Sequence, residues 1–206
     1  PYLDHAGPIA FAHRGGAIDQ PENTMPAFQN AVDLGYRYVE TDVHVTSDGV
    51  LVAFHDPTLD RVTDRTGAIN EMRWSDVAQA RVTGLDGTVA PIPRLDELLS
   101  AFPTLRVNID PKADSSVEPL IDALRAADCL DRVCVGSFSD QRLNRFRTAF
   151  GSDICLGLGT RAIVELRLSS WRVPMRRPTA QAAQVPTHSR GVRVVDSSFV
   201  ATAHRH

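Results

Sequence analysis

The stretch YVETDVHVTSDGVLVAFHD, residues 38–56, alternates apolar and polar side chains on both sides of the dipeptide Asp48-Gly49. Alternation with a period of two is typical of β-strands, and Asp-Gly between two such segments predicts a two-residue hairpin turn. With this turn, Asp42 is expected to lie opposite His55 on one face, with their side chains about 5 Å apart. Glu40 is expected one diagonal step away. The pattern therefore predicts a polar cluster on a strand that folds back on itself.

Outside this stretch, short apolar segments rich in β-branched residues alternate with helical patterns. Such alternation favours parallel strands joined by right-handed crossovers, so we predict an α/β fold with six strand-and-helix units. The turn-rich residues 57–92 are too long for an ordinary connection, which predicts a small insertion after the second strand. The predicted strands lie within residues 9–15, 38–46, 105–112, 133–138, 154–159 and 192–196.

The composition of the chain excludes several classes of partner. The 206 residues are 43% apolar and 23% charged, with a net charge of −3, which gives no reason to expect nucleic acid or an anionic membrane surface. No segment approaches the ~18 apolar residues of a membrane span, so no integral membrane segment is expected. Three cysteines without metal-ligand spacing fit a reducing compartment and hence a cytoplasmic location. A leader ahead of Pro1 remains compatible with the sequence.

Acidic residues on the strand at 38–46 raise the question of charge compensation. Strand alternation places Glu40, Asp42 and His44 on one face. Two carboxylates on a buried strand are costly unless their charges are compensated, either by arginines and backbone donors or by a bound cation. Oxygen ligands suit Mg²⁺ or Ca²⁺ better than zinc. The expected convergence with His55 favours the cation.

Further charged residues lie where two other predicted strands end. His13 and Arg14 follow the first strand, and active sites of parallel β/α folds lie at this end of the sheet. Arg14 suits phosphate or carboxylate recognition, the alternative being a salt bridge to Glu22 or to the acidic pair on the second strand. Asp110 and Lys112 share a face at the end of the third strand. Either Asp110 is a metal ligand and Lys112 a phosphate contact, or the two form a plain ion pair.

Four segments together resemble a known family: HRG at 13–15, PENT at 21–24, ETDVHVTSDGVLVAFHD at 40–56 and NIDPK at 108–112. In this order and spacing they resemble the glycerophosphodiester phosphodiesterases, which are built on a β/α barrel. The resemblance implies a TIM-type (β/α) barrel in a single glycerophosphodiester phosphodiesterase domain over residues 1–206. An eight-unit barrel usually takes about 250 residues.

We therefore expect six of the eight β/α units in this chain, which makes the domain C-terminally incomplete, with residues 57–92 as an insertion within it. Family members continue with two more units. Six strands without the last two would leave the edges of the first and sixth strands unpaired, and unpaired edges favour self-association.

The resemblance also implies roles for individual residues. The histidines that match the family's general acid and base are His13 and His55. One divalent cation, Mg²⁺ or Ca²⁺, would be held by Glu40, Asp42 and Asp110. The family more often has glutamate where this chain has Asp110, and the shorter arm would lengthen the contact or admit a water. Beyond the resemblance, the residues themselves lead us to expect phosphate binding by Arg14 and Lys112. Glu22 and Asp56 are expected to support the site.

The implied reaction is metal-dependent hydrolysis of a small glycerophosphodiester to glycerol 3-phosphate and an alcohol, a step of glycerol and lipid metabolism. The attacking group is either water or the glycerol 2-hydroxyl. Two alternatives stay open at this point. The first is a phosphodiesterase of the sphingomyelinase or phospholipase D type, which acts on choline lipids. The second is an inactive, truncated fragment of the family.

Overall fold

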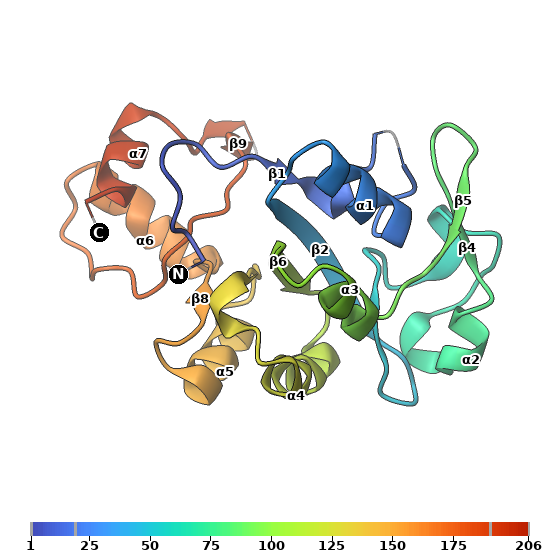
Figure 1. Ribbon diagram of the computed structural model, residues 1–206. Coiled ribbons are helices and arrows are strands. Elements are labelled where there is room, and N and C mark those ends of the chain that lie inside the picture. The colour runs from blue at the N-terminus through green and yellow to red at the C-terminus, as the bar shows by residue number, and fades with distance from the viewer. Residues whose placement is uncertain (1, 19, 190, 206) are drawn as a thin grey trace. The chain divides into compact units, whose positions relative to one another are not determined.

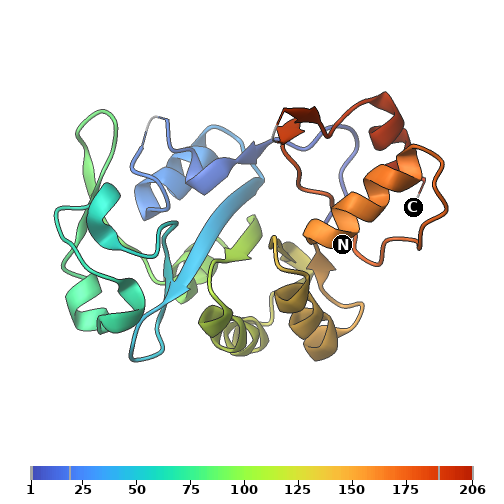
Figure 2. The ribbon, with the colours of Figure 1, turned by 180° about the vertical axis from the view of Figure 1, so that it is seen from behind.

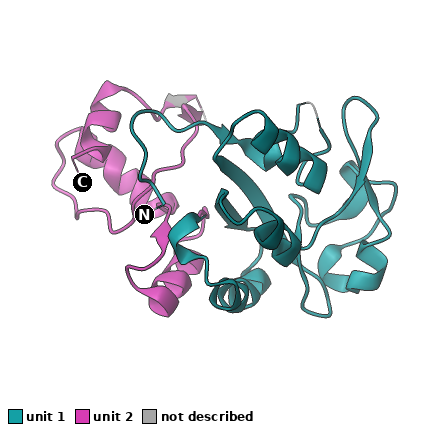
Figure 3. Ribbon diagram, viewed as in Figure 1, with its two compact units in different colours: residues 1–134 teal, residues 135–206 magenta. Residues whose placement is uncertain are grey.

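The computed structural model describes residues 2–18, 20–189 and 191–205, so Pro1, Asp19, Arg190 and His206 lie outside the described residues. The chain divides into two compact units, residues 1–134 and 135–206 (Figure 3). No helix in the described part of the chain is both long enough and apolar enough to cross a membrane.

The first unit is built on parallel strands joined by helices (Figures 1 and 2). β1 (Phe11–Ala12), β2 (Tyr38–Val45) and β6 (Arg106–Pro111) are parallel neighbours in that order, and β3 (Leu51–Ala53) pairs antiparallel with β2. Nearly every residue of β2 is buried, as expected for a strand covered on both faces. The helical elements outside the insertion are η1 (His13–Gly15), α1 (Met25–Asp33), α3 (Leu95–Ala101), η4 (Asp114–Ser116), α4 (Val117–Ala127) and η5 (Leu130–Arg132).

The turn after β1 is held tightly against α1. Gly15 has a φ of +76°, and a Cβ at this position would lie within 3.0 Å of the Phe28 ring. Phe28 and Ala27 are fully buried, because α1 begins after Thr24 with Pro26 in its first turn and turns this face inward. Only glycine therefore fits the end of the HRG segment, and the backbone around His13 and Arg14 is fixed.

The hairpin of β2 and β3 is one residue out of the predicted register. Val43 pairs with Ala53 and His44 with Val52, and the Phe54 amide donates to the Asp42 carbonyl (2.9 Å). The loop has three residues, closed by the Thr46 amide on the Val50 carbonyl, with Gly49 at φ +86°. The Asp48 carboxylate accepts from the Thr46 hydroxyl (2.7 Å) and holds this longer turn. The prediction that Asp42 lies opposite His55 is therefore wrong.

The residues predicted as an insertion form a small substructure with its own apolar cluster. It contains η2 (Leu59–Arg61), η3 (Ile69–Glu71) and α2 (Trp74–Val77), followed by the antiparallel pair β4 (Arg81–Thr83) and β5 (Val89–Pro91). Its buried cluster includes Val52 and Phe54 from the β3 end of the hairpin, so the insertion is anchored beside the segment that holds His55. The other buried members are Leu59, Ile69, Val77, Ala80, Val82 and Ile92.

The second unit continues the alternation of strands and helices. After β7 (Val133–Val135) come α5 (Asp140–Phe150), β8 (Cys155–Leu156), α6 (Thr160–Ser170), β9 (His188–Ser189), β10 (Val192–Arg193) and α7 (Ser197–Ala203). β10 pairs antiparallel with β9, so residues 192–196 do not form the sixth parallel strand that the pattern predicts. Asp196 instead caps α7 by accepting from the Phe199 amide (2.8 Å). A short apolar segment has no signal that distinguishes a local hairpin from a sheet strand.

Candidate active site

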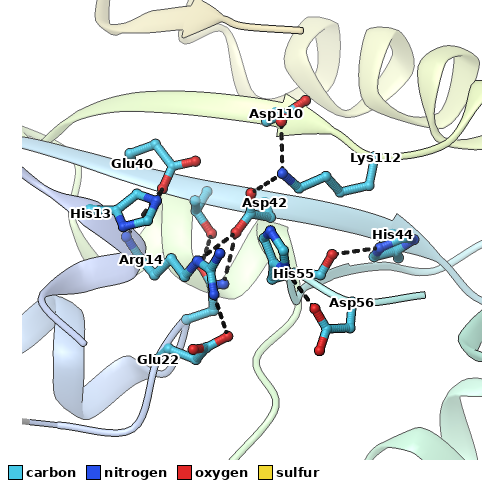
Figure 4. Close-up of polar contacts among 12 residues, drawn as sticks. His13, Arg14, Glu22, Glu40, Asp42, His44, His55, Asp56, Asp110 and Lys112 are labelled. Carbon is cyan, nitrogen blue, oxygen red and sulfur yellow. Dashed lines mark hydrogen bonds and ion pairs between the residues drawn. The ribbon is translucent and has the colours of Figure 1, made fainter. Parts of the chain in front are cut away.

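The polar residues predicted from the sequence lie directly after β1, along β2 and at the end of β6 (Figure 4). Directly after β1, Arg14 adopts φ +53°, and this turn brings its backbone amide to the Glu40 carboxylate (3.1 Å). The Arg14 guanidinium donates from Nη1 to Glu22 Oε1 (3.0 Å), and its Nε lies 3.5 Å from Asp42 Oδ2. Both salt bridges that the sequence left open for Arg14 are therefore present.

Asp42 is the buried centre of the cluster, with 1% of its surface exposed. The register of β2 and β6 pairs it with Asp110, and Lys112 Nζ lies between the two carboxylates, 2.7 Å from Asp42 and 2.8 Å from Asp110. Burial opposes the charge of this ammonium, but hydrogen bonds to Asp110 and Asp42 outweigh burial and raise the pKa of Lys112. Lys112 therefore stays charged, and its single positive charge is shared between the two carboxylates.

Glu40 is less well compensated. Its Oε2 lies 3.6 Å from His13 Nε2 and accepts a hydrogen bond from the Arg14 amide. Burial, reinforced by the charge of Asp42, raises the pKa of Glu40 to about 8. At neutral pH this carboxyl group holds a proton, so the cluster has more carboxylates than its own cations can neutralise.

The two predicted histidines have different surroundings. His13 is mostly exposed, yet partial burial and then the Arg14 charge lower its pKa below 6.5, so the neutral imidazole dominates at pH 7. His55 lies beyond the end of β3, and its Nδ1 is 2.5 Å from Asp56 Oδ1. Its ring points toward the cluster around Asp42 (Figure 4). His55 thus reaches the site through the loop after β3 and not through strand pairing.

Asp56 fixes the tautomer of His55. Burial opposes the charge of Asp56, but the hydrogen bonds with Arg61 and His55 together lower the pKa of this carboxyl group. An ionised carboxylate only accepts hydrogen bonds, so His55 Nδ1 carries the proton in this contact and Nε2 is the ring nitrogen left for the site. His44, on the same strand face as Glu40 and Asp42, instead contacts the His55 carbonyl through Nε2 (3.1 Å).

Two residues of the cluster were missed by the sequence interpretation. Asn23, fully buried at φ +56°, donates from Nδ2 to Asp42 Oδ2 (3.2 Å) and accepts from the Thr41 hydroxyl (2.8 Å). Its place in PENT before the helix was the available signal, because asparagine tolerates left-handed backbone. Arg61, from the insertion, donates to both Glu22 and Asp56. The turn-rich pattern around Arg61 contains no signal for this contact.

The cluster contains oxygen ligands of the kind that a divalent cation binds, but they are not gathered closely around one point. In the described part of the chain, no three His, Cys, Asp or Glu side chains are grouped closely enough to hold a metal ion. Asn108, the register partner of Glu40, is buried, and its Oδ1 accepts no hydrogen bond from any residue that the structure describes. A buried, unpaired amide oxygen beside an undercompensated carboxyl group fits a hard cation.

Comparisons with known proteins agree with this geometry. A family model described as the glycerophosphoryl diester phosphodiesterase family matches residues 13–206. The chain is 37% identical over 212 residues to probable glycerophosphodiester phosphodiesterase 2 of Mycobacterium tuberculosis, covering 98% of this chain and 78% of that protein. It is also 37% identical over 115 residues to lysophospholipase D GDPD1 of Rattus norvegicus, covering 52% of this chain and 37% of that protein.

Solved structures show the same fold. A glycerophosphodiester phosphodiesterase from Agrobacterium tumefaciens superposes with a TM-score of 0.67 at 27% identity, covering 77% of this chain and 69% of that chain. An Oleispira antarctica phosphodiesterase, solved in complex with the product sn-glycerol-3-phosphate, has a TM-score of 0.63 at 27% identity, covering 73% of this chain and 65% of that one. The predicted α/β fold of the TIM type is thereby confirmed, and the chain belongs to the glycerophosphoryl diester phosphodiesterase family.

Proposed function

We propose that this chain hydrolyses glycerophosphodiesters to glycerol 3-phosphate and an alcohol. The observation that carries the proposal is that His13 and His55 lie beside the charged cluster of Asp42 and Lys112 (Figure 4). Cleavage of a phosphodiester requires stabilisation of negative charge and a pair of groups that accept and donate a proton. The site contains both.

Arg14 and Lys112 are the residues that would bind the phosphate group. The Arg14 guanidinium is planar, and its contacts with Glu22 and Asp42 fix its orientation. Lys112 adds a point charge between Asp42 and Asp110. Both cations are held by carboxylates before substrate arrives, so little reorganisation is needed when the phosphate binds.

The two histidines would transfer the protons. His13, with its lowered pKa, is neutral at pH 7 and is the group we assign as proton acceptor from the attacking water or glycerol 2-hydroxyl. His55 is then assigned as the donor to the leaving alcohol, and in this step it acts in its imidazolium form, releasing the Nε2 proton while Nδ1–H stays on Asp56. Asp56 fixes the orientation of the His55 ring through Nδ1, which keeps Nε2 toward the cluster.

One divalent cation, Mg²⁺ or Ca²⁺, completes the proposal, held by Glu40, Asp42 and Asp110. The raised pKa of Glu40 and the unpaired oxygen of Asn108 support a missing positive charge at this place. When bound, such a cation neutralises the phosphodiester and lets Glu40 ionise. The carboxylates of Asp42 and Asp110 would then share their charge between the cation and the Lys112 ammonium.

The experiment measures release of glycerol 3-phosphate from glycerophosphocholine with Mg²⁺, with Ca²⁺ and with a chelator. We expect product only with a divalent cation and not from the His13→Ala variant. Absence of product from folded, cation-supplemented protein would contradict the proposed reaction.

A second candidate is hydrolysis of a lipid phosphodiester, favoured by the likeness to lysophospholipase D GDPD1 over half of this chain. Lysophosphatidylcholine and glycerophosphocholine share the choline and phosphate groups and differ in the acyl chain. A higher kcat/KM for the lysolipid than for glycerophosphocholine would favour this candidate.

Three sequence predictions stay predictions. They are the single domain over residues 1–206 with its insertion, the cytoplasmic location and self-association through sheet edges. Sedimentation velocity over a range of protein concentrations measures the last of these directly.

A further inference from the structure

One guanidinium links two carboxylates that lie behind the candidate active site. Arg61, at the end of η2, donates from Nη2 to Glu22 Oε1 (2.5 Å), from Nη1 to Glu22 Oε2 (3.2 Å) and from Nε to Asp56 Oδ2. The carboxylates are largely buried, whereas 47% of the Arg61 side chain is exposed. The Arg61 side chain therefore bridges the segment before α1 and the segment after β3.

Each of these carboxylates also holds one residue of the proposed machinery. The second oxygen of Asp56 contacts His55 Nδ1 (2.5 Å), and Glu22 Oε1 accepts from Arg14 Nη1 (3.0 Å). Among the residues that the structure describes, the Arg61 side chain forms its hydrogen bonds and ion pairs with Glu22 and Asp56, and not with either histidine or with the carboxylates of the proposed cation site. Through Asp56 and Glu22, Arg61 connects His55, the proposed proton donor, with Arg14, which is proposed to bind the phosphate.

We propose that Arg61 is a positioning residue for the phosphodiester reaction, holding His55 through Asp56 and Arg14 through Glu22. The effect on turnover rests on the proposed function, whereas the effect on the His55 ring does not.

The chemistry of the contact requires arginine. Two carboxylates that share one cation would repel each other without it, and each would then turn toward water or toward another cation. The planar fork of a guanidinium bonds two carboxylates at once in fixed directions, which an ammonium does not. Hydrogen bonds to Glu22 and then Asp56 raise the pKa of Arg61, which agrees with the tight contacts.

The kinetic test compares Arg61→Ala, Arg61→Gln and Arg61→Lys with a matched control, Arg65→Ala, four residues along the same segment. The Arg65 side chain is exposed. For the Arg61 variants we expect kcat to fall by roughly 10- to 100-fold, because small displacements of reacting groups cost rates of this order. KM is expected to rise as Arg14 loses its fixed orientation. The control should keep the wild-type values.

Two further measurements separate positioning from a general loss of structure. Guanidinium ion, below denaturing concentration, should restore part of kcat in Arg61→Ala, since the site of the side chain is half exposed. In the Asp56→Asn background, Arg61→Ala should lower kcat little further, because Asp56 and Arg61 both act on kcat through the His55 ring. The rise in KM, which comes from Glu22 and Arg14, should remain. Wild-type kcat in Arg61→Ala, or independent losses in the double variant, would overturn the proposal.

The tautomer of the His55 ring, which the contact with Asp56 fixes, is measured in the absence of substrate by ¹⁵N NMR of the histidine side chains. We expect a single Nδ1-protonated form in the wild type and in Arg65→Ala, and exchange between tautomers in Arg61→Gln. An unchanged His55 spectrum in a folded Arg61→Gln variant would overturn the inference. An inactive wild type with the expected spectral change would instead reject the proposed function and leave the positioning role supported.

Discussion

Replacing Glu40 with glutamine is predicted to stabilise the cation-free chain at alkaline pH. The carboxyl group is largely buried beside Asp42, and these two causes raise its pKa from 4.5 to about 8. Between these values the folded chain holds a proton that the unfolded chain has lost. The contribution of Glu40 to the free energy of unfolding is therefore most favourable below pH 4.5, falls as pH rises toward 8 and then levels off. Glutamine does not titrate and removes this loss.

The size of the effect follows from the pKa. Each pH unit is equivalent to 1.36 kcal/mol, so a rise from 4.5 to about 8 is worth at most about 5 kcal/mol. Water that reaches the charged carboxylate would reduce this, so we expect Glu40→Gln to gain about 2 to 5 kcal/mol at pH 8.5. Glutamine keeps an oxygen for the Arg14 amide, so this hydrogen bond is not lost.

The assay is thermal unfolding in chelator at pH 4.5, 7 and 8.5, with Glu71→Gln as the matched control. Glu71 is exposed and lies in the insertion. A gain of this size shifts Tm by about 2 to 4 °C per kcal/mol in a chain of 150 to 250 residues. The variant and the wild type should unfold together at pH 4.5 and separate as pH rises. A pH-independent difference, or a less stable variant at pH 8.5, would refute the reasoning.

Three further predictions concern the same site. His13→Ala and His55→Ala should each lower kcat by about 10² or more in the glycerophosphocholine assay, and full activity in either variant would remove that residue from the mechanism. The acidic limb of the kcat/KM profile should fall below pH 6.5, because burial and Arg14 lower the pKa of His13; a limb above pH 6.5 would contradict this assignment. Lys112→Met should destabilise the cation-free chain by at most about 3 to 5 kcal/mol, since it removes the nearer of the two cations beside the buried Asp42 carboxylate and leaves only Arg14. Added Ca²⁺ should recover part of that loss in thermal unfolding, and no recovery would count against the cation site.

Several features of the fold follow from local sequence patterns. The alternation in residues 38–45 predicts β2 and places Glu40, Asp42 and His44 on one face, because side chains of a strand alternate whatever lies around them. The start of α1 after Thr24 follows from Pro26 and the apolar spacing behind it. Patterns of this kind depend on backbone geometry over a few residues.

The hairpin register and the placement of His55 do not follow from such patterns. A turn of two residues and one of three are both compatible with Asp-Gly, and the Asp48 carboxylate decides between them through Thr46 and the Trp74 amide. A shift of one residue moves every side chain to the other face, so the strand prediction could not position His55 correctly.

By itself, the sequence determined the family motifs, the strand that holds the acidic residues and the types of side chain available for chemistry. Only the tertiary structure decided that Lys112 lies between Asp42 and Asp110, that Asn23 supports Asp42 and that Arg61 joins Glu22 to Asp56. The physical reason is the separation along the chain of the residues that determine each feature. Periodicity arises from neighbouring residues, whereas the pairing of buried charges depends on where distant strands and loops meet, and each charge takes the partner that this meeting brings within reach.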